Sequence, residues 1–152
     1  MWKDAVIIGM GIVVFVRAGH AAVLHVGNDG LADYGTIQMA IDAAIDGDVV
    51  TVSDGTYSGP GNRDIDFLGK AITVRSERGP TNCTIDCGGS EAEPHLAFCF
   101  HCAEGRDSVL DGFTIMHGFH EEAGAIYCTY VSIRDPRGLS LIHISEPTRL
   151  RR

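Results

Sequence analysis

Hydrophobic residues between positions 34 and 57, YGTIQMAIDAAIDGDVVTVSDGTY, follow first a helical period and then a strand-like run. Thr36 suits the N-cap of a helix, and Gly47 suits the left-handed position that ends one. The pattern therefore predicts an amphipathic helix over residues 36–46 with one buried side. The residues that share this apolar face are Ile37, Ala40, Ile41, Ala44 and Ile45.

A β-branched run follows the helix directly. Val49, Val50, Thr51 and Val52 predict a short strand, and SDGTY after them carries Asp-Gly turn chemistry. Short apolar runs then continue, each closed by glycine, proline or asparagine, and none shows a second helical face. They are DIDF (64–67), AITVRS (71–76), CTIDC (83–87), LAFCFHC (96–102), SVLDGFTIM (108–116) and GAIYCTYV (124–131).

The spacing of these runs, roughly 7 to 14 residues, suits an antiparallel sandwich or a solenoid of short parallel strands. The connections GPGNR, RGPTN and GGSEAEP vary in length and differ from two-residue hairpin loops. A solenoid also exposes an open hydrophobic end that needs a cap, and an amphipathic helix near the N-terminus can supply one. The sequence therefore favours an all-β solenoid.

Three segments together resemble the right-handed parallel β-helix proteins of the pectate-lyase-like superfamily. They are Y.TIQ.AID.A.DGD.V.V..GTY (34–57), IDFLGKAITVRSERGPTNCTIDC (65–87) and SVLDGFTIMHG (108–118). More narrowly, the chain resembles exported bacterial members described as β-helix repeat proteins, over about residues 33 to 128. The resemblance implies a cap helix followed by coils of three strands, and the candidate strands make roughly two to three coils. It is less specific for function, since the superfamily includes lyases, glycoside hydrolases, adhesins and proteins without known activity.

Charge and the first residues bear on location. The 152-residue chain has a formal net charge of -8, which disfavours nucleic acid and anionic membranes as partners. Lys3, the apolar run 5–16 and the small residues around Ala21 and Ala22 fit a secretory signal peptide over residues 1–22. Asp4 and Arg17 depart from that pattern, and a buried first strand or an uncleaved anchor is the alternative. We therefore expect a secreted or cell-surface protein with no membrane span in its mature part.

One pair of carboxylates is a candidate for chemistry. If Ile65 and Phe67 point inward on a strand, Asp64 and Asp66 point outward on the same side, about 6.5 to 7 Å apart. That separation suits a calcium pair or the two carboxylates of a glycosidase. It is equally typical of a solvated strand face, and no third catalytic partner is evident.

Basic side chains near this pair are candidate ligands for an acidic sugar. Arg63, Lys70 and Arg75 lie close to it in sequence, and Asp86 and Asp111 extend the acidic row onto neighbouring coils. The candidate partners are thus a polysaccharide or another cell-surface component. No cofactor is required, with calcium left as an option.

The cysteines and histidines give weaker signals. Cys83, Cys87, Cys99, Cys102 and Cys128 form an odd set, for which buried core thiols or one disulfide between coils are favoured over zinc. Cys83 and Cys87 lie about 13 Å apart on an extended strand and cannot bond each other there. The segment HGFHEE (117–122) is interpreted as a polar turn rather than a metal site.

The chain divides into a signal peptide (1–22), a lead-in (23–35), a cap helix with coils (36–131) and a tail (132–152). In the tail, GLSLIHISEPTR resembles translated adapter or vector sequence, so we expect a non-native or disordered end to a truncated β-helix. The sequence favours a non-catalytic scaffold or carbohydrate-contacting module, part of a longer exported protein. The alternative is the N-terminal part of a polysaccharide lyase or glycoside hydrolase with its active site on missing coils.

Overall fold

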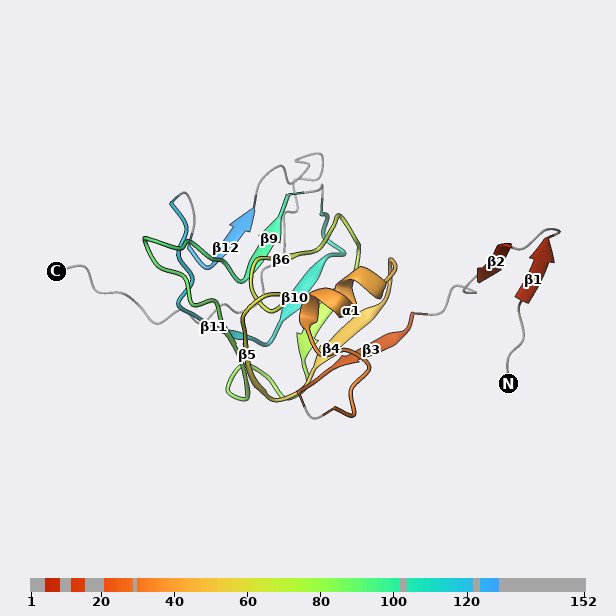
Figure 1. Cartoon of the computed structure of the whole chain (residues 1–152), viewed down its shortest axis with the longest axis horizontal. Helices are drawn as coiled ribbons and strands as arrows, with labels where there is room; N and C mark the ends of the chain where they lie inside the picture. The colour runs from red at the N-terminus through yellow and green to blue at the C-terminus, as the bar shows by residue number, and fades with distance from the viewer. Residues whose placement is uncertain are drawn as a thin grey trace.

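The computed structural model describes residues 5–8, 12–15, 21–28, 30–101, 104–121 and 124–128. Its main body is a parallel β-solenoid of about four turns with a single short helix near its start (Figure 1). The helix and strands of the solenoid are β3 (Val23–Val26), α1 (Ile37–Ala43), β4 (Val49–Val52), β5 (Gly55–Ser58), β6 (Ile65–Asp66), β7 (Thr73–Ser76), β8 (Cys83–Asp86), β9 (Phe98–Phe100), β10 (Val109–Asp111), β11 (Thr114–Met116) and β12 (Ile126–Cys128).

Three parallel sheets run along the solenoid, and each later turn adds one strand to each sheet. The β4 sheet contains β3, β4, β7 and β10; the β5 sheet contains β5, β8 and β11; the β6 sheet contains β6, β9 and β12. Strands of two to four residues suffice because each one pairs in parallel with a strand of a neighbouring turn. The predicted coil of three strands is confirmed.

The core consists of inward side chains stacked by this register. In the β4 sheet, Leu24, Val50, Val74 and Leu110 form one column. Alternation along each strand sends these residues inward and their neighbours outward. Beneath the β6 sheet the stacking is aromatic, with the Phe67 ring centroid 6.0 Å from that of Phe98 and 4.5 Å from that of Phe100.

Helix α1 covers the first turn, as predicted. Thr36 is its N-cap, with a side chain that accepts a hydrogen bond from the Met39 amide. Ile37, Ala40 and Ile41 are fully buried, and the helix contacts β3, β4 and β6. The apolar stripe thus closes the interior of the solenoid at this end.

The end of the helix differs from the prediction. Ala44 already has an extended backbone, so the helix stops at Ala43, and Ile45 is 46% exposed instead of facing the first turn. Asp48, whose side chain is buried, explains this path: its carboxylate accepts hydrogen bonds from the Ile45 amide at 3.0 Å and from the Ala22 amide at 2.8 Å. Gly47, with φ of 90°, lies in the turn that leads into β4 rather than at the helix end.

The prediction of two to three coils was too low. Residues 23–26, predicted to belong to a lead-in, form β3 and pair in parallel with β4. The GTY segment, predicted to be a turn, lies in strand β5 and pairs with β8. The run SVLDGFTIM contains two strands, β10 and β11, because the chain bends at Gly112, where φ is 78°.

Near the N-terminus, β1 (Ala5–Ile8) and β2 (Ile12–Phe15) pair as an antiparallel hairpin. These strands lie within the predicted signal peptide, whose cleavage remains a prediction. Among the described residues, no helix is both long enough and apolar enough to cross a bilayer. The predicted tail, residues 132–152, lies outside the described residues.

The cap assignment predicts opposite results for two isoleucines. Ile41→Asp places an unpaired charge against the apolar first turn and is expected to lower the free energy of unfolding by about 3 to 5 kcal/mol. Ile45→Asp is the matched control, since Ile45 is 46% exposed, and is expected to change it by less than about 0.5 kcal/mol. Urea denaturation followed by circular dichroism measures both. Equal losses for the two variants would contradict the cap assignment.

Candidate functional site

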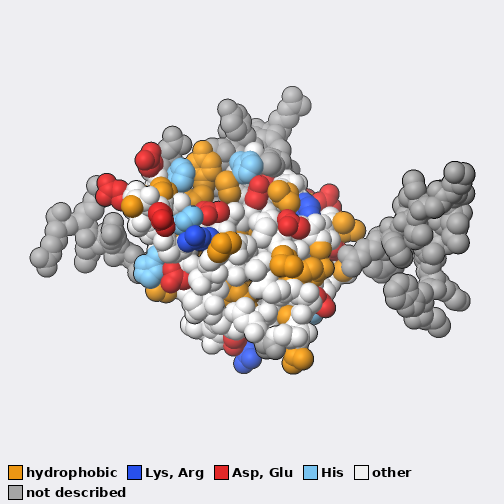
Figure 2. Space-filling view, in the orientation of Figure 1, with side chains coloured by type: hydrophobic (Ala, Val, Ile, Leu, Met, Phe, Trp, Pro, Cys, Tyr) orange, Lys and Arg blue, Asp and Glu red, His pale blue; other side chains and the backbone are white. Residues whose placement is uncertain are grey.

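Three aspartates each contact a histidine from the following turn of the solenoid. Asp64 Oδ2 lies 2.6 Å from His95 Nδ1, and Asp66 Oδ2 lies 2.9 Å from His101 Nε2. In the third pair, Asp86 Oδ1 lies 2.8 Å from His117 Nδ1. We call these three contacts the Asp–His pairs. Figure 2 shows histidines beside acidic side chains across the upper part of the visible face.

The register of the strands explains why these side chains meet. Asp86 of β8 lies opposite Met116 of β11, so His117, one residue further on, comes beside it. Likewise, Asp66 of β6 lies opposite Cys99 of β9, two residues before His101. Parallel strands lie about 4.8 Å apart, which brings side chains one turn apart within hydrogen-bond reach.

Backbone amides hold the first two carboxylates as well. Asp64 Oδ1 accepts a hydrogen bond from the Leu96 amide at 2.8 Å, and Asp66 Oδ1 accepts one from the Leu68 amide at 2.8 Å. Both oxygens of each carboxylate are therefore engaged, one with a histidine and one with the backbone. The backbone near them is also unusual, since Asp64 has a φ of 53° and Leu68 a φ of 57°.

The protonation of the pairs follows from the chemistry of the carboxylate. An ionised aspartate can only accept hydrogen bonds, so the histidine nitrogen that faces it must carry the proton. Its other ring nitrogen is then an acceptor when the imidazole is neutral. The side chain of His117 is 59% exposed and that of His101 is 42% exposed, whereas that of His95 is 22% exposed. Two of the three imidazoles thus face solvent.

The loops that carry His95 and His117 are packed tightly against each other. The Phe119 amide donates to the His95 carbonyl at 2.8 Å, and the Gly89 amide donates to the His117 carbonyl at 2.7 Å. A Cβ atom at Gly89 would lie 2.7 Å from the His95 carbonyl oxygen, so only glycine fits between these loops. The backbone therefore fixes the positions of both histidines.

The surroundings of the Asp86–His117 pair shift the pKa of one carboxyl group, that of Asp86, and of one thiol, that of Cys87. The hydrogen bond from His117 is the main cause that holds the pKa of Asp86 below its usual range, with a further contribution from the Gly88 amide. The pKa of the Cys87 thiol is raised to about 12, mainly by burial and in smaller part by the nearby carboxylates of Asp64 and Asp86, while Arg63 opposes the rise. Cys87 is therefore a neutral thiol rather than a nucleophile at neutral pH.

The predicted basic ligands occupy three separate places. Arg63 Nη1 donates to the Cys87 carbonyl at 3.2 Å, beside the Asp–His pairs. Lys70 Nζ donates to the carbonyls of Ile41 at 2.6 Å and Asp42 at 2.9 Å, near the C-terminal end of α1. A cation is favourable at that end of a helix, so Lys70 stabilises the cap.

Arg75 lies elsewhere, on the outer face of the β4 sheet. It is exposed and lies between Thr51 and Asp111 in the register of that sheet. The structure thus brings Arg63 close to Asp64 and Asp86, and it does not bring Lys70, Arg75 and Asp111 together with them.

The calcium option does not fit the carboxylates as they stand. Calcium needs six to eight oxygen ligands, whereas the oxygens of Asp64 and Asp66 already accept hydrogen bonds. Within the part of the chain that the structure describes, no three His, Cys, Asp or Glu side chains form a group that could hold a metal ion. His117 of the HGFHEE segment pairs with Asp86, and the His120 ring lies 5.4 Å from that of Tyr127.

The described cysteines are thiols, and Cys102 lies outside the described residues. Cys83 and Cys87 are buried at the start of β8 and just after its end, as expected for core thiols. Burial is also the main cause that raises the pKa of Cys83 to about 12.

Comparison with known proteins gives no family and no relative. No family model, no curated protein and no solved structure matches the chain. The geometry of the described residues therefore carries the functional argument.

The pair Asp86–His117 predicts a loss of stability in acid. Because folding lowers the pKa of Asp86, its contribution to stability is fully present above the unfolded value of about 3.9 and disappears as the pH falls through the folded value. Replacement of His117 by Gln removes the main cause of that shift. We expect the parent to be more stable than His117→Gln at pH 5, with a difference that shrinks towards pH 2.

Urea denaturation across this pH range measures the difference. His25→Gln is the control, because His25 is exposed on the β4 sheet, and its curve should parallel that of the parent. A His117→Gln deficit that stays constant from pH 5 to pH 2 would contradict the coupling.

Proposed function

We propose that the chain is a non-catalytic β-solenoid scaffold whose outer surface contacts carbohydrate, as part of a secreted or cell-surface protein. The narrower relationship that we infer is to exported bacterial β-helix proteins of the pectate-lyase-like superfamily. Support for that relationship comes from the sequence segments 34–57, 65–87 and 108–118, which fall on the cap helix and the stacked strands.

One observation carries the non-catalytic part of the proposal. The carboxylates of Asp64 and Asp66 are each held by a histidine of the next turn and by a backbone amide. A catalytic acid or nucleophile needs an oxygen directed at the substrate. Carboxylates engaged in this way are better suited to link one turn to the next than to act on a substrate.

Contact with carbohydrate is supported by the chemistry of the outer surface. Imidazole and carboxylate groups project from successive turns at the spacing of the strands, as in the three Asp–His pairs. Such rows provide many donors and acceptors for a polyhydroxylated polymer. Export is supported by the charged, apolar and small-residue pattern of residues 1–22.

A second candidate function rests on the Asp–His pairs. A histidine oriented by a carboxylate is the usual arrangement of a general base, and His101 and His117 expose their rings to solvent. This feature favours the N-terminal part of a polysaccharide lyase or glycoside hydrolase, whose remaining groups lie on further coils.

An activity assay separates the two candidates. The chain is incubated with pectate, alginate and xylan, with and without calcium, and the release of unsaturated or reducing ends is measured. We expect no release above the rate without protein, together with retention of the chain on at least one immobilised polysaccharide.

Asp66→Ala and Thr56→Ala serve as the matched pair of variants. Thr56 is exposed on the β5 sheet, away from Asp66. Cleavage by the parent that disappears in a folded Asp66→Ala and persists in Thr56→Ala would establish the enzyme and refute the scaffold.

A further inference from the structure

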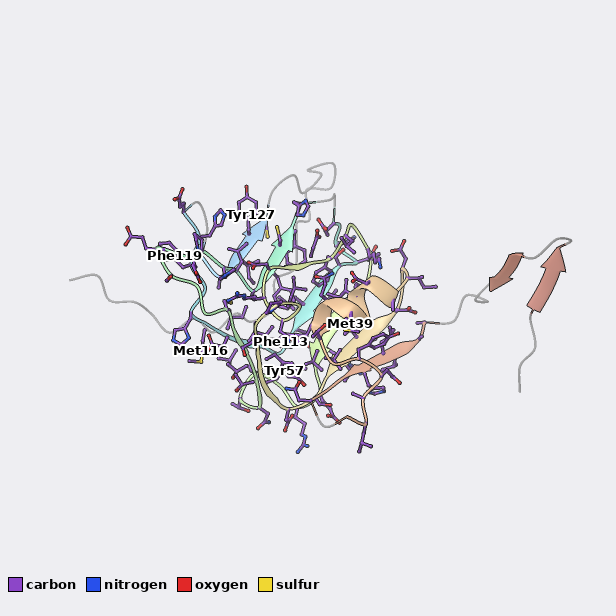
Figure 3. All side chains as sticks on the ribbon, in the orientation of Figure 1. Met39, Tyr57, Phe113, Met116, Phe119 and Tyr127 are labelled. Carbon is purple, nitrogen blue, oxygen red and sulfur yellow. The ribbon has the colours of Figure 1, made fainter. Side chains whose placement is uncertain are left out.

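An aromatic platform lies on the outer face of the β6 sheet, in the last described turn. Tyr127 is the central residue of β12, between Ile126, which packs against the core, and Cys128. Its ring lies 5.4 Å from the ring of His120, with the planes inclined by 40°. In Figure 3 the Tyr127 side chain projects from the edge of the molecule, on the same side as Phe119. We call Tyr127 and His120 the Tyr127 platform.

The platform continues a column of outward residues along the solenoid. In the register of the β6 sheet, Tyr127 follows Cys99, and Cys99 follows Asp66. Phe98 and Phe100 are buried, which confirms that Cys99 between them faces outward. Two strand spacings therefore place the Asp66 backbone about 10 Å from that of Tyr127.

The surroundings of the platform are polar and fixed. Phe119, next to His120, is tied by its amide to the His95 carbonyl, and His95 contacts Asp64. His101, which directly follows β9, contacts Asp66. Ligand sites combine aromatic side chains with a small number of positioned polar groups, and the Tyr127 platform and its neighbours offer both.

Charge narrows the class of glycan. Asp64, Asp66 and Asp86 are acidic, and Arg63, the basic residue placed among them, donates to the Cys87 carbonyl. The formal net charge of the whole chain is -8. An anionic sugar would be repelled by this surface, whereas an uncharged sugar loses nothing by approaching it.

We propose that the Tyr127 platform binds an uncharged glycan, with one sugar ring stacked on Tyr127 and neighbouring hydroxyl groups bonded to the side chains towards Asp66. This inference rests on the proposed carbohydrate contact. It names the residues that make the contact and the class of carbohydrate that they bind. It also excludes the acidic sugars that Arg63, Lys70 and Arg75 suggested in the sequence.

Titration calorimetry of the full chain with three hexasaccharides tests it: xylohexaose, which is uncharged, hexagalacturonate, which is anionic, and deacetylated chitohexaose, which is cationic. We expect xylohexaose to bind at least about tenfold more tightly than hexagalacturonate. We expect Tyr127→Ala to weaken xylohexaose binding about five- to tenfold, because the stacking surface is lost. Tyr127→Phe keeps the ring and should remain within about threefold of the parent.

Thr56→Ala on the β5 sheet is the control and should bind as the parent does. His120→Ala provides a second reading of the platform if Tyr127→Ala does not fold, as judged by circular dichroism. Unchanged xylohexaose binding in the folded platform variants would overturn the site and leave the carbohydrate contact standing. Preference for hexagalacturonate would overturn the uncharged class. Binding of deacetylated chitohexaose alone that disappears in high salt would do the same. Failure of the parent to bind any of the three would overturn the proposed function as well.

Discussion

Parallel pairing between successive turns is the interaction on which the rest of this structure depends. It sets each residue directly above its counterpart one turn earlier, so that Val50 lies against Val74 and Val74 against Leu110. The same stacking applies outside the solenoid, where it brings Asp86 beside the residues that precede His117. Side chains alternate between the two faces of a strand. A shift of the strand register by one residue would therefore turn the core column outward and, at the same time, break the Asp–His pairs.

This constraint also explains why the cap is necessary. The first turn has no earlier turn to cover it, and Ile37 and Ile41 of α1 provide the missing apolar contact. Asp48 and Lys70 then fix the C-terminal end of the helix, one through the Ile45 amide and the other through the Ile41 carbonyl. Both side chains thus bond to backbone groups at the C-terminal end of the helix.

Local patterns in the sequence were sufficient for the cap helix and for the inward direction of Ile65 and Phe67, because both depend on neighbours within a few residues. The partners of Asp64 and Asp86 were not predictable in the same way. Each lies 31 residues further along the chain, and that separation depends on loop lengths that no local pattern fixes. The one signal in the sequence that could have predicted these pairs is a histidine that follows an aspartate at about the length of one coil. The exposure of Ile45 was missed because it depends on the buried Asp48.

The central claim is that the Asp–His pairs tie one turn to the next, and a double-mutant cycle tests it most directly. The free energy of unfolding is measured by urea denaturation for the parent, Asp66→Asn, His101→Gln and the double variant. For a pair whose side chains are 25% and 42% exposed, the account predicts a favourable coupling of about 0.5 to 1 kcal/mol at pH 6. Single losses that add to within about 0.3 kcal/mol would show that the two side chains do not hold the turns together.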